Sequence, residues 1–173
     1  METFTLNRED LGPFLTGCAG GYDVQIPVWA GEGHYRFSPL DEQGSKAVAL
    51  EYHRTLLPPK KYFFPAEETL FHFDESGYHP EPAKQSLQKP LLLFGLHPCD
   101  LHGLTILDNF FSVPYEDLAY QTRRQQGVIV GLGCLPDEKC FCASMASQEI
   151  AEGYDLFFWD LGRRFYVLVG TEA

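Results

Sequence analysis

Residues 91–100 read Leu-Leu-Leu-Phe-Gly-Leu-His-Pro-Cys-Asp, and residues 128–134 read Val-Ile-Val-Gly-Leu-Gly-Cys. Each stretch begins with a short apolar run of the length typical of a buried strand and ends on or beside a cysteine. Between them, apolar residues recur at helical spacing from Leu101 to Phe111, and a second helix is predicted from about Tyr115 to Gln126. Strand, helices and strand make a βαβ crossover. Because its strands are parallel, the crossover should bring both cysteine-bearing ends to one edge of a sheet.

The flanking sequence predicts hairpins and one short helix. Residues 22–39 alternate apolar and polar residues around a Gly-containing turn, which predicts a β-hairpin. Residues 154–170 have apolar and aromatic residues on either side of Asp160-Leu161-Gly162-Arg163 and predict a second one. A helix ending near Thr16 is expected, with Asn7 or Asp10 as its cap.

The middle of the chain is rich in proline. Residues 58–65 should be extended, residues 68–73 form a strand, and residues 74–90 form a long surface loop. The expected fold class is α+β: a single domain over residues 1–173, with a mixed β-sheet, a central βαβ unit and β-hairpins.

Composition excludes several classes of protein. The chain has 173 residues and a formal net charge of -11, which argues against a nucleic-acid or anionic-membrane partner. The N-terminus carries charges where a signal peptide needs an apolar core, and no apolar run is long enough for membrane insertion. A soluble, cytoplasmic protein is expected. In the reducing cytosol, five cysteines indicate metal or redox chemistry before disulfides.

Four of these cysteines are the candidate ligands of one metal centre: Cys99, Cys134, Cys140 and Cys142. Thiolates in fours suit an iron-sulfur cluster, for which [4Fe-4S] is favoured over [2Fe-2S], and they also suit zinc. The spacing is neither a ferredoxin run nor a pair of zinc knuckles, so zinc stays open, as does simple burial of free thiols. Cys99 lies near a helix N-terminus, which should favour its thiolate. Cys18 is interpreted as structural.

Several neighbours of the cysteines have two possible roles. His97 could replace a thiolate ligand, hydrogen-bond a cluster sulfur, or simply face solvent. Asp100 and His102 are expected to be capping and surface groups. Arg123 and Arg124 either neutralise an anionic cluster or a partner's carboxylates, or form a solvated basic pair.

The chain resembles a known family: the iron-sulfur beta subunits of cytoplasmic hydrogenase/sulfur reductases, together with the related iron-sulfur subunit of anaerobic sulfite reductase. The residues that carry the resemblance are Pro58 to Pro65, Gly95 to Leu104, Arg123-Arg124, Gly133-Cys134, Cys140 to Met145 and Gly153 to Leu156. The likeness implies an electron-transfer subunit with a cluster bound by the four named cysteines. It also implies two partners, one of them flavin-bearing and of the NAD(P)H type, the other catalytic. Family members continue into a ferredoxin-like region, which this chain lacks, so the full relay is not expected in this polypeptide.

Two other functions are weighed against electron transfer. The first is a non-redox scaffold or interaction domain of an oxidoreductase complex, with structural zinc or no metal. The second is a thiol-redox enzyme that uses the neighbouring cysteines and would show a rapidly alkylated cysteine of low pKa.

Overall fold

The computed structural model describes residues 2–40, 48–80, 89–149 and 152–170. The strands are β1 (Thr3–Asn7), β2 (Asp23–Gly31), β3 (His34–Pro39), β4 (Phe71–Asp74), β5 (Gly77–Pro80), β6 (Leu91–Leu96), β7 (Gly127–Leu132), β8 (Leu156–Asp160) and β9 (Arg164–Val169). The helices are α1 (Leu11–Cys18), α2 (Pro98–Phe110) and α3 (Leu118–Gln125), with two short 3-10 segments, η1 (Arg8–Asp10) and η3 (Pro59–Tyr62).

Seven strands form one mixed sheet in the order β1-β9-β8-β7-β6-β2-β3. Its centre is parallel, because β2 pairs with β6, β6 with β7 and β7 with β8 in the same direction. The outer pairs are antiparallel: β2 with β3, β8 with β9, and β9 with β1. The predicted α+β class is therefore confirmed, with its mixed sheet, central βαβ unit and flanking hairpins.

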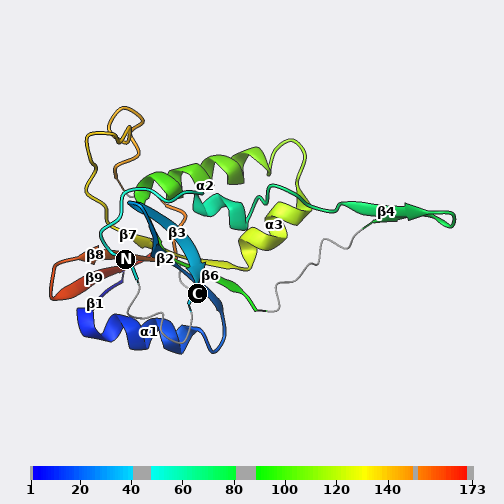
Figure 1. Ribbon diagram of the computed structural model, residues 1–173. Coiled ribbons are helices and arrows are strands. Elements are labelled where there is room, and N and C mark those ends of the chain that lie inside the picture. Colours follow the sequence, from blue (N-terminus) through cyan, green and yellow to red (C-terminus); the bar gives the residue numbers. More distant parts are fainter. Residues whose placement is uncertain (1, 41–47, 81–88, 150–151, 171–173) are drawn as a thin grey trace.

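Helices cover both faces of this sheet, α1 on one and α2 and α3 on the other (Figure 1). Every residue of β6 is consequently buried, as expected for a central parallel strand. The two faces have separate apolar clusters. Leu11 and Leu15 of α1 belong to one cluster, and Leu101 and Leu104 of α2 belong to the other.

The chain between β6 and β7 follows the predicted crossover with one shifted boundary. Helix α2 begins at Pro98, where the missing amide proton costs least. Helix α3 begins at Leu118 rather than near Tyr115, because Asp117 is its N-cap and accepts a hydrogen bond from the Tyr120 amide. At the N-terminus, α1 runs to Cys18, and its N-cap Asp10 makes no capping side-chain hydrogen bond.

The structure differs from the predictions for the flanking sequence in three places. Strand β1 was not predicted; it is short and mostly exposed, and it is held by pairing with β9 at the edge of the sheet. Residues 59–62 form η3 rather than an extended segment, because Pro59 stands at the first position, where no amide donor is needed. Within the predicted loop 74–90, β5 pairs with β4, while residues 81–88 lie outside the described part of the chain.

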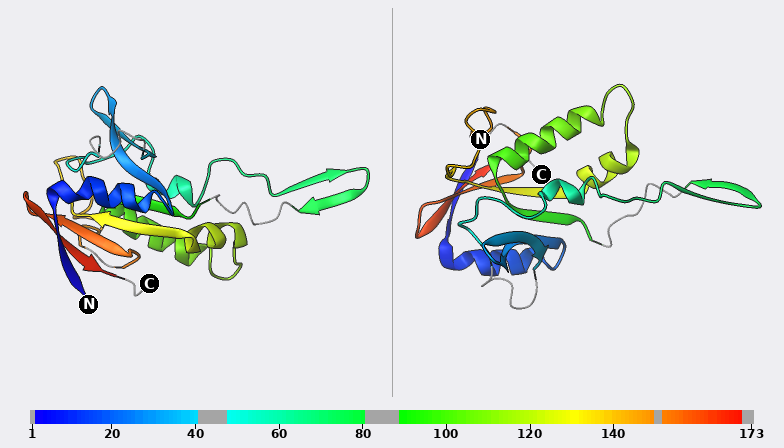
Figure 2. Two further views of the ribbon diagram at one scale, coloured as in Figure 1. Left: turned by 90° about the horizontal axis from the view of Figure 1, so that it is seen from below. Right: turned by 45° about the horizontal axis from the view of Figure 1, so that its top comes forward.

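The β4–β5 hairpin projects far from the sheet, and both views in Figure 2 show it as an extended arm. Residues that face each other across the hairpin share a side. Phe73 is paired with Tyr78, and His72 with His79, so one side is aromatic and the other is polar. The aromatic side chains Phe71, Phe73 and Tyr78 are exposed.

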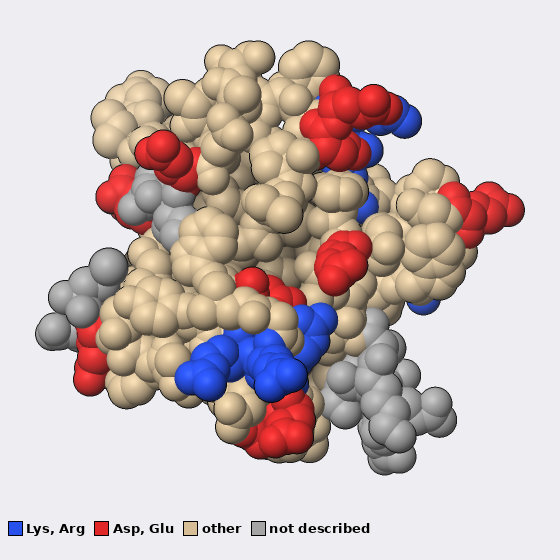
Figure 3. Space-filling model, turned by 90° about the vertical axis from the view of Figure 1, so that its left-hand side faces the viewer, with Lys and Arg blue, Asp and Glu red and all other residues tan. Residues whose placement is uncertain are grey.

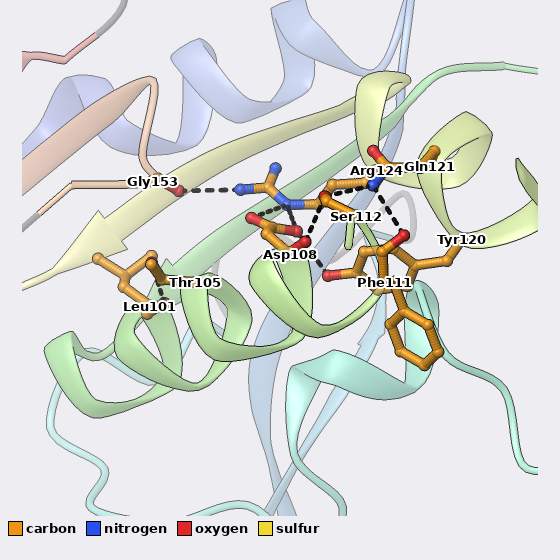
Figure 4. A network of polar contacts seen from close by, with 9 residues as sticks. All are labelled: Leu101, Thr105, Asp108, Phe111, Ser112, Tyr120, Gln121, Arg124 and Gly153. Atoms are coloured by element: carbon orange, nitrogen blue, oxygen red, sulfur yellow. Dashed lines mark hydrogen bonds and ion pairs between the residues drawn. The ribbon is translucent and has the colours of Figure 1, made fainter. Parts of the chain in front are cut away.

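Arg124 joins α2, α3 and the segment before β8 (Figure 4). Its Nε donates to both carboxylate oxygens of Asp108 at 3.1 Å, and its Nη2 donates to the Gly153 carbonyl at 3.5 Å. The Tyr120 hydroxyl donates to the same carboxylate at 2.6 Å. Arg123 forms an ion pair with Glu68. Both arginines therefore bind carboxylates within the chain. They do not form a solvated basic pair, and they do not lie beside the cysteines.

Gly131 provides a test of the packing between β7 and β8. A Cβ added to Gly131 would lie 2.3 Å from Cδ2 of the buried Phe157 ring. We expect Gly131→Ala to lower the free energy of unfolding by about 1–3 kcal/mol through overpacking. Gly103→Ala in α2 is the matched control. No atom lies within 4 Å of its new Cβ, and we expect a gain of about 0.5–1 kcal/mol. Urea unfolding measures the free energy of unfolding of both variants. An equal change in the two variants would contradict the contact between Gly131 and Phe157.

Candidate functional site

The four candidate cysteines lie at the carboxyl edge of the parallel strands. Cys99 is the second residue of α2, directly beyond β6, and Cys134 lies two residues beyond β7. Cys140 and Cys142 follow in the loop after β7. All four line one small cavity of about 20 Å³, together with His97, Pro98 and Pro136. The thiols of Cys99 and Cys142 are within hydrogen-bonding reach of each other. The crossover thus brings the four sulfurs together.

The environment of the thiols disfavours their charged form. Burial, followed by the Asp100 carboxyl and by Cys142, raises the pKa of Cys99 to about 12. Burial, followed by Cys140 and Cys142, raises the pKa of Cys134 to about 11. The expected lowering of the Cys99 pKa by the helix N-terminus is wrong, because desolvation and neighbouring anions outweigh the helix dipole. Four thiolates in this space would repel one another unless a cation were bound among them.

Cys140 is engaged by an ion pair that sequence reasoning did not detect. Arg54 and Asp137 form a bidentate pair with N–O distances of 3.0 and 2.8 Å. The Cys140 thiol donates to Asp137 Oδ1 at 3.1 Å, and the Asp137 amide donates to Cys140 Sγ at 3.4 Å. The hydrogen bond from Arg54, followed by that from Cys140, holds the pKa of Asp137 well below its ordinary value. Arg54 and Asp137 are 83 residues apart in the sequence, and no local pattern links them.

His97 does not face solvent. Its side chain is only 2% exposed, and its ring stacks on Tyr52 with centroids 4.0 Å apart. The Tyr52 hydroxyl donates to the Gly95 carbonyl at 2.7 Å, which fixes this pair against the end of β6. Burial, followed by repulsion from His53, lowers the pKa of His97 to about 4, so its imidazole is neutral.

The remaining candidates divide between the site and the body of the protein. Asp100 is more than a helix-terminal group, because its carboxyl acts on Cys99, Cys134 and Tyr52, and burial raises its own pKa to about 6. His102 contacts the Glu149 carbonyl at 3.1 Å. Cys18 ends α1 and packs against the apolar cluster on the α1 face of the sheet, as a structural cysteine would.

The donor set fits an iron-sulfur cluster, since four cysteines and two histidines, His53 and His97, line one cavity. The cavity as it stands has room for about one water-sized group. Among the residues that the structure describes, no three His, Cys, Asp or Glu side chains are already arranged to hold a metal ion.

A second, larger cavity adjoins the cysteines and shares Cys134 and His53 with them. It encloses about 520 Å³ and is lined in part by Trp159, Leu135 and Arg8. Figure 3 shows this end of the molecule, where uncharged surface covers much of the upper half and basic side chains gather lower down. Exposed apolar side chains of the cysteine-bearing loop are Leu135, Phe141 and Met145.

In the described ranges, no helix has the length and apolar character needed to cross a membrane.

Fold and site together define a class of protein: an α+β chain with a cysteine-lined cavity at the carboxyl edge of its parallel strands. The chain is 35% identical over 137 residues to Sulfhydrogenase 2 subunit beta of Pyrococcus furiosus. The match covers 79% of this chain but only 39% of that protein. It supports the hydrogenase beta-subunit family, and the resemblance of the sequence to hydrogenase beta subunits is confirmed over the matched region. No family model matches the chain, and no solved structure matches it.

The raised thiol pKa values predict slow alkylation. The thiolate is the reactive form, and Cys99 and Cys134 keep their protons until the pH approaches 11–12. In the metal-free folded protein, we expect iodoacetamide to modify these two residues slowly at about pH 7–8 and faster only as the pH rises toward 11. Mass spectrometry of peptides measures each site, and the urea-unfolded chain is the control, with thiols of ordinary pKa. Rapid alkylation of either residue at neutral pH would instead support the thiol-redox enzyme.

Proposed function

We propose that the chain is an electron-transfer module that binds one iron-sulfur cluster through Cys99, Cys134, Cys140 and Cys142. A [4Fe-4S] cluster is favoured over [2Fe-2S], and residues 1–173 act as a single iron-sulfur domain. The cluster would accept and release single electrons, and the chain itself would catalyse no bond chemistry. The observation that carries this proposal is that four cysteines from separate chain positions line one cavity. Soft thiolate ligands in this number are what iron-sulfur clusters require.

The surroundings of the cysteines support a bound anionic group. The Asp137 amide donates to Cys140 Sγ at 3.4 Å, and Arg54 Nη1 lies 3.9 Å from the same sulfur. Such donors lower the energy of charged sulfur and tune cluster potentials. The sulfurs lie near the surface, and exposed apolar side chains of their loop offer a docking surface for a redox partner.

The proposed partners follow from the family. The named relative is a beta subunit, which favours a multisubunit assembly for this chain. We propose that it relays electrons between a flavoprotein subunit of the NAD(P)H type and a catalytic subunit, in a cytoplasmic hydrogenase- or sulfite-reductase-like complex. A ferredoxin-like domain would carry the further clusters of the relay. The match to 39% of the relative's length leaves room for such a region in a longer protein.

The test is anaerobic purification followed by iron and acid-labile sulfide analysis, a visible spectrum and EPR after reduction. We expect brown protein with iron and sulfide in equal amounts and an EPR signal from the reduced cluster. Colourless protein with stoichiometric zinc would overturn electron transfer and favour the non-redox scaffold. In that case, partner binding should also survive Cys140→Ser together with Cys142→Ser.

A further inference from the structure

The cavity offers more donor groups than the four that a cluster uses, because His53 and His97 line it together with the four cysteines. The four thiols act on one another: Cys142 and Cys134 act on Cys99, Cys140 and Cys142 act on Cys134, and Cys142 acts on Cys140. The two donors that matter here are the thiol of Cys140 and the imidazole of His97. These two residues differ sharply in how firmly the protein holds them.

His97 is fixed and has one ring nitrogen without a partner. Stacking on Tyr52 and burial at the end of β6 hold the ring in place. The backbone of His53 hydrogen-bonds the ring and acts to raise its pKa, as an accepting carbonyl does. Nε2 is buried, and none of the described residues hydrogen-bonds it. A neutral imidazole that donates one N–H to the backbone presents a lone pair on its other nitrogen, which is the usual arrangement of a metal-binding histidine.

An orphaned nitrogen of this kind requires an explanation, because buried polar groups are nearly always hydrogen-bonded. His97 lines the same cavity as the cysteines, so the simplest explanation for the unpaired nitrogen is that it binds a ligand in that cavity.

Cys140, in contrast, has partners outside the cavity. Its thiol donates to the Asp137 carboxylate at 3.1 Å, and Arg54 holds that carboxylate in place. Cys140 shares an irregular loop with Cys134 and Cys142, whereas His97 and Cys99 flank the start of a long helix. Of the four thiols, Cys140 is therefore the one that local interactions can most readily withdraw from a cluster.

We infer that His97 is a reserve ligand, which takes the fourth position on the cluster through Nε2 when Cys140 is withdrawn. This inference rests on the proposed iron-sulfur function. The four-thiolate form and the form with three thiolates and one imidazole would differ in reduction potential. A neutral imidazole in place of an anionic thiolate makes the cluster less negative, so adding an electron costs less and the potential rises, as it does when histidines replace cysteines in Rieske centres.

The test uses Cys140→Ala, reconstituted with iron and sulfide under anaerobic conditions. We expect it to keep iron and sulfide close to the wild-type content, with a more positive reduction potential. Pulsed EPR of the reduced protein should show a directly coordinated nitrogen, and labelling with ¹⁵N-histidine should change its couplings. The matched control is Cys142→Ala, which should lose the cluster because the Cys142 thiol lies within hydrogen-bonding reach of the Cys99 thiol in the cavity lining.

The variant His97→Ala separates a reserve ligand from a structural residue. Combined with Cys140→Ala it should lose the cluster, and the iron and sulfide content of His97→Ala alone is the reference for that loss. Far-UV circular dichroism of both proteins checks that the fold is kept. Loss of the cluster in Cys140→Ala alone, or retention without nitrogen coupling, would overturn the inference and leave the proposed function standing. Wild-type protein that takes up no iron and sulfide would overturn both.

Discussion

Cys134→Ala should remove iron and acid-labile sulfide from the anaerobically prepared protein, together with its visible absorption and EPR signal. Cys134 stands two residues beyond β7 and acts electrostatically with both Cys140 and Cys142, so it joins the strand end to the loop thiols. Iron and sulfide analysis, with the protein concentration taken from amino-acid analysis, measures the loss.

Cys18→Ala is the control for Cys134→Ala. Cys18 packs against the apolar cluster beneath α1, on a face of the sheet away from the cysteine-lined cavity, so this variant should keep the full iron and sulfide content. The far-UV spectrum of Cys134→Ala should match that of the wild type, because the thiol lies outside both apolar clusters. Normal cluster content in Cys134→Ala would contradict the proposed ligand set.

Phe157→Ala should produce the largest loss of stability, about 3–5 kcal/mol in the free energy of unfolding. The ring is fully buried, lies between Tyr154 and Trp159 at centroid distances of 5.5 and 5.2 Å, and covers Gly131. Its removal leaves a cavity between β7 and β8 that the sheet cannot close. Urea unfolding of the metal-free protein measures the loss without a contribution from bound metal.

Two further variants are controls for the unfolding experiment on Phe157→Ala. Phe73→Ala removes the same side chain from an exposed site on β4 and should change the free energy of unfolding by less than about 0.5 kcal/mol. Gly131→Ala combined with Phe157→Ala should cost little more than Phe157→Ala alone, because the clash and the cavity occupy the same space. Simple additivity of the two costs would contradict the contact between Gly131 and Phe157.

The sequence predicted the parts of the fold whose signal is local. The apolar run of β6, proline at the start of α2 and the apolar and aromatic residues of β8 and β9 each identify an element without reference to the rest of the chain. Strand β1 alternates Thr with Phe4 and Leu6, but it has only five mostly exposed residues and is held by pairing with β9 at the other end of the chain. The same holds for β5, whose short polar sequence forms a strand only by pairing with β4.

The site divides in the same way. The cysteines could be found because their residue type is rare and they follow strand ends, and the parallel crossover then indicates that they lie together. Asp137 lies in the cysteine-bearing loop, but its partner Arg54 and the His97 neighbour Tyr52 come from a distant segment of ordinary composition, so only the folded chain reveals these contacts. The direction of the thiol pKa shifts was also beyond the sequence, because desolvation depends on what covers each sulfur.

The two apolar clusters enclose none of the four cavity-lining cysteines. The sheet and its helices can thus reach their final packing while those sulfurs are still reduced thiols. The proposed cluster would therefore enter a finished scaffold with its acceptor groups presented at one rim, rather than a nascent chain that needs the metal in order to collapse.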